Sequence, residues 1–467
     1  MPDVDLMPRW KRLVDRNPGP AYLSIVLALE DSLRQRLLQD GDRLPPQRQI
    51  ARMLGVDLTT VTRGFSEARR RGLIEATVGR GTFIKTGAGD AGWRDTQGAI
   101  IDLTMNIPPV PDSPSLENLI QSDMRALLRK SDSGALLSYR VTGGTVEERR
   151  LGAEWVKPLV GARKEDLVLI VPGAQAAIAA VVSTLTSPGD TILTDRFTYP
   201  GIRAVAAQFG LIIKGVEGDA EGMMPDAMDD VCRRYAPKLI YCTPTVQNPS
   251  TATMSVQRRE AILAVARQHR LFLLEDDPYG LLLRDPLPAL AQLDPSRVFY
   301  ISSLSKVISP GLRLAYLVVP SMEAGYRMTS AIRALSLASS GLMTSLATRW
   351  IQNGSAGAIL SAIQTELRER QAIALGILGG GHGMHPDGPH VWLKLPEWWE
   401  SAEFVSHARK QGLGLVPGSV FAVEHEPPRR VRIALGSASS RESLEPSLRR
   451  VADLLVHRRE HGFGAVV

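Results

Sequence analysis

Apolar residues between positions 20 and 40 recur at steps of three and four, which is the period of one face of an α-helix. The positions are Tyr22, Ile25, Val26, Leu29, Leu33 and Leu37. They predict an amphipathic helix that ends near Gly41. Pro45 and Pro46 follow, and two prolines suit a loop that leads into the first turn of another helix.

Two more helical patterns come next. A second, short helix is expected from Gln47 to Leu54, because the pattern stops at Gly55. A third helix is expected from about Asp57 to Arg71, with inward-facing apolar positions at Val61, Phe65 and Ala68. The small N-terminal module is therefore predicted to have a helical core.

A hairpin is predicted after the third helix. Residues 73–76 and 82–84 suit short strands, and they enclose Gly79-Arg80-Gly81. The two glycines permit positive φ, which favours a tight turn. Three helices followed by a basic hairpin predict a winged helix-turn-helix over residues 20–85, whose third helix would lie in the DNA major groove. A three-helix protein-interaction module is the alternative.

Beyond residue 100, apolar segments alternate with helical ones. Helices are expected from Ala174, near Arg203 and over residues 256–269. The apolar segments are residues 167–171, 191–195, 238–242, 271–276, 298–303 and 314–319. Continuous apolar strands between helices predict an α/β domain with a mainly parallel central sheet covered on both faces. Ligands of such folds collect at the carboxyl ends of the strands.

Composition sets the domain boundaries. Residues 86–99 are rich in Gly and Ala and lack an apolar period, so they predict a flexible linker. The linker separates the small module from a large domain over residues 100–467, and residues 1–19 are an N-terminal extension. No apolar run reaches about 18 residues, so no membrane span is expected. We expect a cytoplasmic protein, because the N-terminus lacks the apolar region of a signal peptide and two cysteines build no disulfide framework.

Charge divides the chain unequally. The 467 residues carry a net charge of +6, and residues 43–85 alone hold nine basic and three acidic residues, which gives the same +6. This imbalance favours a polyanion as the partner of the small module, although a solvated helix end at residues 69–71 is the alternative. Side chains placed to reach bases or phosphates are Arg48, Thr59, Thr60, Arg63 and Arg80.

The ends of the apolar strands carry chemistry that suits pyridoxal phosphate. Lys306 follows one strand within the run SLSKVISPGLR, so a lysine, hydroxyls and an arginine lie close together. The lysine can form a Schiff base with the cofactor's aldehyde. Asp276, at the end of another strand, can keep the pyridine nitrogen protonated. A helix N-terminus beginning at Ala174, together with hydroxyls and an arginine, can hold the phosphate.

The small module resembles the DNA-binding domain of GntR-type bacterial regulators. The run GDRLPPQRQIARMLGVDLTTVTRGFSEARRRGLIEATVGRGTFI matches the family pattern along its length. The resemblance implies that double-stranded DNA is the partner, contacted by Arg48, Thr59, Thr60, Arg63 and the wing around Arg80. Family members often carry Arg directly after the helix cap, where this chain has Leu58. That departure puts a direct guanine contact there in doubt.

The large domain resembles fold-type I aminotransferases over nearly its full length, through the motifs RFTYPG, PTVQNPS, LLEDDPYG and RRVRIALG. The resemblance implies pyridoxal 5′-phosphate as cofactor, with Lys306 forming the internal aldimine. It implies Asp276 at the pyridine nitrogen, and the adjacent Asp277 is the competing carboxylate. The other implied cofactor contacts are Asn248, Tyr279, Tyr199, Ala174, Gln175, Ser303, Ser305, Arg313 and Tyr139, the last reaching the phosphate of the neighbouring subunit.

On the ligand side, the resemblance implies that Arg432 binds a carboxylate and that Asn106, in MNIPP, lines the pocket. A GntR-type winged helix joined to an aminotransferase-like domain resembles the MocR subfamily of bacterial regulators. That resemblance covers residues 20–450. It implies a transcription factor that senses an amine or amino-acid effector and forms a homodimer, with a head-to-tail arrangement.

Several other interpretations compete with this one. A working aminotransferase with an attached DNA-binding domain is possible, because the catalytic set is complete. A regulator that senses only the cofactor is another possibility. Ser303-Leu304-Ser305-Lys306 also fits the S-x-x-K motif of penicillin-binding proteins, but no S-D-N motif accompanies it. His382 and His385 could suggest a metal, yet no cluster of partners is evident, and we expect no metal site.

Overall fold

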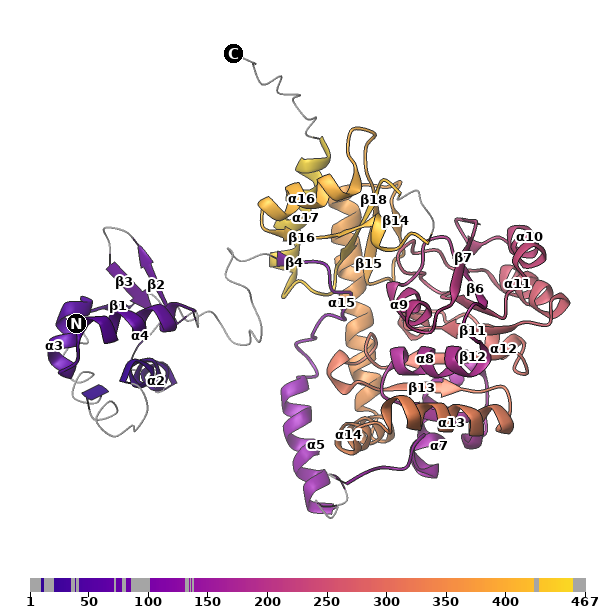
Figure 1. Cartoon of the computed structure of the whole chain (residues 1–467), viewed down its shortest axis with the longest axis horizontal. Helices are drawn as coiled ribbons and strands as arrows, with labels where there is room; N and C mark the ends of the chain where they lie inside the picture. The colour runs from indigo at the N-terminus through magenta and orange to yellow at the C-terminus, as the bar shows by residue number, and fades with distance from the viewer. Residues whose placement is uncertain are drawn as a thin grey trace. The chain divides into compact units, whose positions relative to one another are not determined.

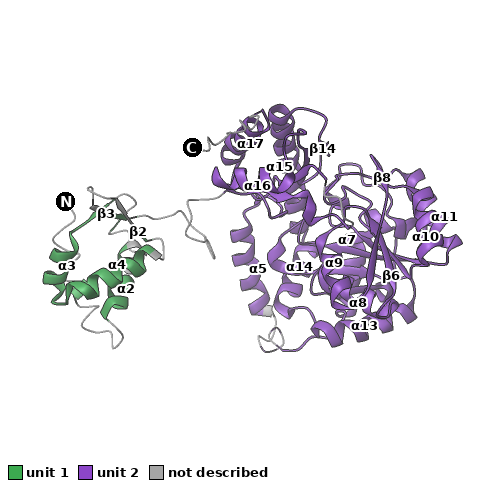
Figure 2. Cartoon of the chain, turned by 45° about the horizontal axis from the view of Figure 1, so that its top comes forward, with its two compact units in different colours: residues 1–99 green, residues 100–467 purple. Residues whose placement is uncertain are grey.

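A computed structural model describes residues 10–11, 21–34, 38, 42–70, 73–77, 81–84, 101–130, 134, 136, 138–423 and 428–456. The chain divides into two compact units, Met1–Ala99 and Ile100–Val467 (Figure 2). The predicted linker, residues 86–99, and most of the predicted N-terminal extension lie outside the described residues. Each unit has its own hydrophobic core and is treated by itself.

The small unit packs helices against a short antiparallel sheet (Figure 1). Its core contains Ile25, Ile50, Val61 and Phe65, all of them buried. The helices are α2 (Ala21–Arg34), α3 (Gln47–Leu54) and α4 (Leu58–Arg70), and the strands are β1 (Arg43–Leu44), β2 (Ile74–Thr77) and β3 (Gly81–Ile84). The three predicted helices and the pairing of the two hairpin strands are confirmed. The predicted end of the first helix, near Gly41, lies outside the described residues.

Two details of the small unit follow from single residues. Gly55 ends α3 with a φ of 72°, a left-handed conformation that glycine adopts without a steric penalty. Strand β1 was not expected from the sequence; its residues, 43 and 44, pair antiparallel with β3. Leu44 is buried in the core, which explains why this stretch lies against the sheet.

A seven-stranded sheet forms the centre of the large unit, with strand order β5-β13-β12-β11-β10-β6-β7. The strands are β5 (Val168–Val171), β6 (Thr191–Asp195), β7 (Ile212–Val216), β10 (Leu239–Cys242), β11 (Phe272–Asp276), β12 (Val298–Ser303) and β13 (Ala315–Val318). The sheet is mainly parallel, as predicted, and β13 runs antiparallel to both of its neighbours. Strand β7 was not expected from the sequence.

Helices cover both faces of this sheet (Figure 1). One apolar cluster joins one face to α7 (Val146–Val160), α10 (Pro225–Tyr235), α11 (Val256–Gln268) and α14 (Gly341–Gln352). A second cluster joins the other face to α8 (Ala174–Leu185), α9 (Pro200–Gln208) and α13 (Met322–Ser336). Local signals set the helix starts; Thr145 and Glu148, for example, form a capping box at α7.

A C-terminal lobe completes the large unit. Its antiparallel sheet has the order β14-β15-β18-β17, and it packs with α16 (Ser401–Lys410) and α17 (Arg441–Val456) around a third apolar cluster. The strands are β14 (Gly383–Met384), β15 (His390–Lys394), β17 (Val416–Pro417) and β18 (Arg430–Ala434). The remaining elements are α5 (Leu116–Lys130), α12 (Leu290–Leu293), α15 (Ser355–Leu378), β4 (Ile101–Asp102) paired with β16 (Leu413–Gly414), and β8 (Gly218–Asp219) paired with β9 (Gly222–Met223). Among the described residues, no helix has the length and apolar character that a membrane crossing needs.

Candidate functional site

Polar side chains gather at the carboxyl edge of the seven-stranded sheet. Asp276 is the last residue of β11, Ser303 is the last residue of β12, and Lys306 lies in the turn after β12. Gly173 lies between the end of β5 and the start of α8. Because parallel strands end at the same edge, residues far apart in the sequence meet there.

Lys306 is half-buried, and its Nζ donates a hydrogen bond to the backbone oxygen of Asn106. Burial and the nearby Arg432 and Arg313 lower the pKa of the lysine ammonium to about 8, although Asp276 opposes the shift. The neutral amine is the form that attacks an aldehyde. This environment therefore makes the neutral form more available near neutral pH than it is in a solvated lysine.

Asp276 and Asp277 differ in their partners. Oδ2 of Asp276 accepts a hydrogen bond from the Tyr241 hydroxyl at 2.7 Å, while Oδ1 is buried without a partner. Both oxygens of Asp277 are used, by the Gly280 backbone N–H at 2.7 Å and by the Tyr300 hydroxyl at 3.2 Å. Burial raises the pKa of both carboxyls, to about 6 for Asp276. Of the two, Asp276 has an oxygen available for another group.

Asn106 connects three parts of the site. Its Nδ2 donates to the Tyr279 hydroxyl at 2.8 Å and lies 3.2 Å from Nδ1 of His390. Nε2 of His390 lies 3.2 Å from the backbone oxygen of Pro249. Burial and the nearby Arg432 lower the pKa of His390 to about 3, so the ring is neutral, donating from Nε2 and accepting at Nδ1. Oδ1 of Asn106 is buried and has no partner.

Arg432, on β18, faces the same site. Its Nη1 donates to Oδ1 of Asn248 at 2.8 Å, and its Nη2 donates to the backbone oxygen of Thr104 at 2.6 Å. The guanidinium lies 5.0 Å from the ring centre of Phe421, and its Nε is buried without a partner. Arg432 is almost fully buried, and the partners found for it are neutral, so a carboxylate is the ligand that its charge favours.

The start of α8 offers an anion site. Gly173 precedes it with a φ of 93° and no side chain caps the helix, so its first backbone N–H groups point outward. A Cβ at Gly173 would lie 3.5 Å from Nη2 of Arg313, which places that guanidinium beside the helix start. Gln175, in the first turn after Ala174, donates from Nε2 to the backbone oxygen of Gly201 at 2.9 Å, and its Oε1 has no partner.

The remaining predicted site residues fall into two groups. Ser303 and Ser305 are buried together, and the N–H of Ser305 donates to the Ser303 Oγ at 3.2 Å. Tyr199 is half-buried at the start of α9, and burial and the nearby Asp276 raise the pKa of its hydroxyl. Tyr139 is different, because 90% of it is exposed and no hydrogen bond joins it to the site among the described residues.

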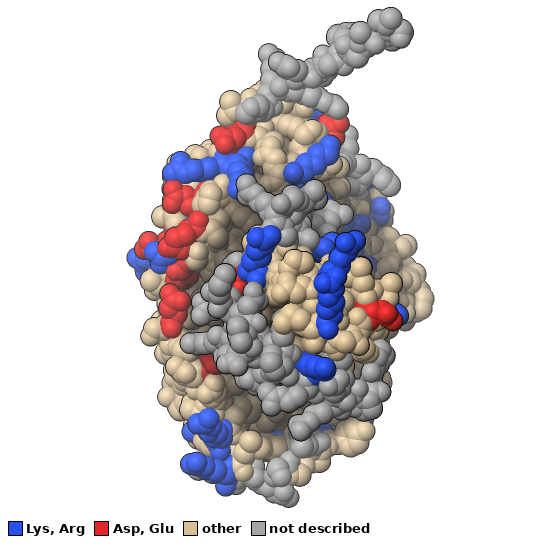
Figure 3. Space-filling model, turned by 90° about the vertical axis from the view of Figure 1, so that its left-hand side faces the viewer, with Lys and Arg blue, Asp and Glu red and all other residues tan. Residues whose placement is uncertain are grey.

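The predicted DNA contacts lie on α3 and α4 of the small unit. Arg48, Thr59 and Arg63 are exposed and Thr60 is half-buried, while Arg80 lies outside the described residues. The Arg63 guanidinium lies 4.3 Å from the ring centre of Tyr22, which holds it against α2. Figure 3 shows one face of the molecule, on which exposed Lys and Arg side chains can be seen beside Asp and Glu side chains. The exposed basic side chains described in the small unit are Lys11, Arg43, Arg48, Arg52, Arg63 and Arg69.

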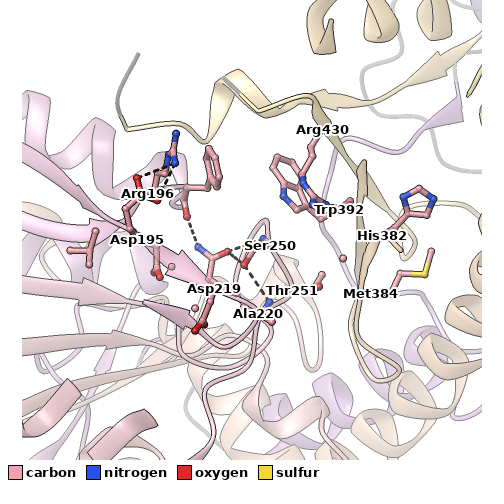
Figure 4. A pocket seen from close by; sticks show the side chains of 18 of the residues that line it. Asp195, Arg196, Asp219, Ala220, Ser250, Thr251, His382, Met384, Trp392 and Arg430 are labelled. Carbon is pink, nitrogen blue, oxygen red and sulfur yellow. Dashed lines mark hydrogen bonds and ion pairs between the residues drawn. The ribbon is translucent and has the colours of Figure 1, made fainter. Parts of the chain in front are cut away.

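A separate cavity of about 580 Å³ lies between the ends of β6 and β7 and the C-terminal sheet (Figure 4). Trp392 contributes to its wall and lies 5.7 Å from Phe421, the ring beside Arg432. The charged Arg196 is paired with Glu217 at 3.0 Å, so these charges compensate each other. Arg430 also lines the cavity, two residues from Arg432 on β18.

A group of three or more His, Cys, Asp or Glu side chains that could hold a metal is not found among the described residues. His382 lies 3.2 Å from the Leu378 oxygen through Nε2, and its Nδ1 accepts from the Lys394 N–H at 3.1 Å. Nδ1 of His385 accepts from the Asp387 N–H at 3.2 Å. Backbone groups therefore occupy both ring nitrogens of His382 and Nδ1 of His385.

Sequence reasoning missed several residues of the site. His390, Tyr241 and Tyr300 are buried in strands, and their sequence context is that of ordinary core residues. A histidine at the start of the apolar stretch HVWLK was the available signal, because a buried histidine needs hydrogen-bond partners. Thr104 contributes through its backbone oxygen, for which the side-chain pattern gives no signal.

Comparison with known families matches the whole architecture. Residues 99–451 match the model of aminotransferase class I and II, and residues 21–84 match the model of bacterial regulatory proteins of the gntR family. The HTH-type transcriptional regulator YdeF of Bacillus subtilis is 30% identical over 444 residues, covering 94% of this chain and 95% of that protein. The predicted combination of domains is therefore confirmed.

Enzymes resemble the large unit alone. The 2-aminoadipate transaminase of Thermus thermophilus is 27% identical over 360 residues, covering 74% of this chain and 88% of that enzyme. The crystal structure of LysN, an α-aminoadipate aminotransferase from Thermus thermophilus, superposes with a TM-score of 0.70 at 25% identity and covers 76% of this chain and 92% of its own. It was solved with N-(5′-phosphopyridoxyl)-L-leucine. The kynurenine aminotransferase of Pyrococcus horikoshii has the same fold, with a TM-score of 0.71 at 22% identity, covering 77% of this chain and 91% of its own.

Proposed function

Because the chain belongs to the class I and II aminotransferases and joins that domain to a gntR-family DNA-binding domain, as MocR-type regulators do, we propose that it is a transcriptional regulator controlled by pyridoxal 5′-phosphate and an amine or amino-acid effector. The observation that carries the proposal is the meeting of Lys306 and Arg432 in one site of a chain that also carries a gntR-family domain. The lysine suits a cofactor aldehyde, and the arginine suits a ligand carboxylate.

The residues present fit this cofactor. Four of the residues around the site keep a buried polar atom without a partner: Asn106, Gln175, Asp276 and Arg432. Asp276 can pair with the pyridine nitrogen through Oδ1, and the start of α8 with Arg313, Ser303 and Ser305 can hold the phosphate. When bound, the cofactor supplies an aldehyde that links to amines and a ring that withdraws electrons. Tyr199 would stack on that ring, and Tyr279 and Asn248 would bind its hydroxyl.

The proposed effector carries an amine and, because of Arg432, a carboxylate. The amine would replace Lys306 at the cofactor, and the carboxylate would bind the arginine fork. A ligand shifts a two-state equilibrium only through its different affinities for the two states. The proposed regulation therefore requires two states of the protein, one that binds DNA and one that does not, with different affinities for the effector.

We also propose a homodimer, arranged head to tail. Tyr139 supports it, because its exposed ring is free to reach the phosphate of a neighbouring subunit. A dimer would bring two winged helices to two half-sites of an operator. A protein with this role would act in the cytoplasm, where the DNA is.

The second candidate function is a working aminotransferase. The set of Lys306, Asp276 and Arg432 favours it, because an enzyme of this fold would use the same three side chains. The test is a steady-state transamination assay beside a DNA-binding assay on the same preparation. The regulatory proposal expects DNA binding that responds to an amine, with little turnover. Turnover of about 1 s⁻¹ or more, within the usual enzyme range, with unresponsive DNA binding, would establish the enzyme instead.

A further inference from the structure

The large unit begins with a stretch that crosses the candidate site, residues 101–107, which we name the leading segment. It starts as β4 beside β16, and the Leu103 N–H donates to the Gly414 oxygen at 3.0 Å. The Ala434 N–H, at the end of β18, donates to the Leu103 oxygen at 2.9 Å. Backbone hydrogen bonds therefore join the first residues of the leading segment to the C-terminal lobe.

Its next residues lie against both cations of the site. The Thr104 oxygen accepts from Nη2 of Arg432 at 2.6 Å, and the Asn106 oxygen accepts from Nζ of Lys306. These are the two side chains that the proposed effector would engage. Occupancy of the site must therefore change the hydrogen bonds of the leading segment, because each cation then has a new partner.

The side chain of Asn106 fixes the position of its own carbonyl. Its Nδ2 donates to Tyr279 and contacts His390, so the residue is anchored on two sides and is 7% exposed. The chain just beyond it is also confined, since a Cβ at Gly436 would lie 2.0 Å from the Ile107 oxygen. The Asn106 carbonyl is thus presented to Lys306 by contacts that do not involve the lysine.

We infer that Asn106 is a positioning residue that transmits the covalent state of Lys306 to the leading segment. The inference rests on the proposed function and deepens it. While Lys306 carries the cofactor, its Nζ is committed to that bond. When an amine effector takes its place, a bond forms between the effector nitrogen and the cofactor carbon and the bond from that carbon to Nζ breaks. The two protons lost by the effector nitrogen return to Lys306 as a free amine, which then donates to the Asn106 oxygen.

The consequence reaches the linker through the chain itself. Residues 86–99 lie one residue before the leading segment in the sequence, and the predicted DNA-binding module, residues 20–85, precedes them. The added hydrogen bond from Lys306 to Asn106 restrains the backbone of the leading segment, which is where the linker joins the large unit. Ordering a segment in response to a ligand is a recognised way to couple two sites.

The experiment compares two cofactor forms that differ in one covalent bond. Full-length protein is loaded with pyridoxal 5′-phosphate, which links to Lys306, or with pyridoxamine 5′-phosphate, which leaves the lysine free. Backbone amide hydrogen exchange is then measured by mass spectrometry for peptides that contain Leu103, Thr104 and Ile107. We expect exchange there to be about 5-fold slower in the pyridoxamine form, the effect of one hydrogen bond.

Two variants sharpen the comparison. Asn106→Ala should abolish the difference between the two forms, whereas Met105→Ala should keep it, because Met105 is 57% exposed. Equal exchange in the two wild-type forms would overturn the inference, and so would a difference that survives in Asn106→Ala. Borohydride trapping is done first: a failure to link pyridoxal phosphate to Lys306 would overturn the proposed function together with the inference, whereas linkage with equal exchange overturns the inference alone.

Discussion

The Tyr241 hydroxyl donates a 2.7 Å hydrogen bond to Oδ2 of Asp276, which leaves Oδ1 of the same carboxylate buried and unpartnered. The neighbouring Asp277 has both oxygens occupied. From this difference we propose that Asp276 serves the cofactor and that Asp277 serves the fold.

The first prediction follows from that difference. Asp276→Asn should weaken pyridoxal phosphate binding by about 10-fold or more, because a charge-assisted hydrogen bond is lost. The melting temperature of the cofactor-free protein should not fall, since a buried charge is removed with it. Asp277→Asn should instead lower the melting temperature and leave cofactor affinity within about 3-fold. Absorbance titration and thermal melting of both variants give the comparison, and equal cofactor affinities would count against the assignment.

The second prediction concerns pH. The pKa of Lys306 is lowered to about 8, chiefly by burial, so the lysine is mostly protonated below pH 8 and mostly neutral above it. Since only the neutral amine attacks an aldehyde, the rate of cofactor attachment should rise from pH 6 to 9 with a midpoint near 8. Stopped-flow absorbance measures that rate. A midpoint above pH 10, the range of a solvated lysine, would show that burial does not act on this group.

The third prediction tests the arginine fork. Arg432→Lys should keep the covalent cofactor but weaken a carboxylate-bearing effector by about 10-fold or more, because lysine cannot make two parallel hydrogen bonds. Arg430→Lys is the matched control, since Arg430 lies two residues away on the same strand and lines a different cavity. The cofactor spectrum is followed during titration with amino acids. If both variants bind alike, Arg432 is structural or the effector is a simple amine.

The fourth prediction concerns DNA. Binding should weaken steeply with salt, because each phosphate contact releases counterions. Arg48→Ala should weaken binding to all sequences alike, as expected for a backbone contact from α3. Thr60→Ala and Arg63→Ala should also change sequence preference, since both lie on α4, the expected major-groove helix. Fluorescence anisotropy of the full chain on several duplexes at several salt concentrations measures this, and binding that is indifferent to salt would refute it.

Much of this architecture could be predicted from the sequence, for identifiable reasons. Most strands of the large sheet are continuous apolar runs, and the helices of the small unit have clear apolar stripes. Both patterns could therefore be recognised in the sequence. The short strand β1 did not, because its pairing depends on Leu44 reaching a core formed by distant residues. Strand β7 is an edge strand with an exposed first residue, so its apolar signal is weak.

The sequence could predict which residues form the site, but it could not predict the hydrogen bonds between them. Motifs located Lys306 and Arg432, whereas the preference for Asp276 over the adjacent Asp277 came only from the spacing that the family resemblance implies. Their separation depends on Tyr241, which lies on a neighbouring strand. The sequence analysis did not identify His390 for the same reason, because its hydrogen-bond partners come from segments more than 100 residues away in the sequence.

The most direct test of the central claim is the affinity of the full chain for the DNA upstream of its own gene, measured with pyridoxal phosphate and a panel of amines and amino acids. The account predicts that at least one compound changes the dissociation constant by about 5-fold or more, the usual scale of coupling between two sites. It also predicts that Lys306→Ala, which cannot carry the cofactor, binds the same DNA without that response. A dissociation constant unaffected by the cofactor and by every amine, or an equal response in Lys306→Ala, would contradict the account.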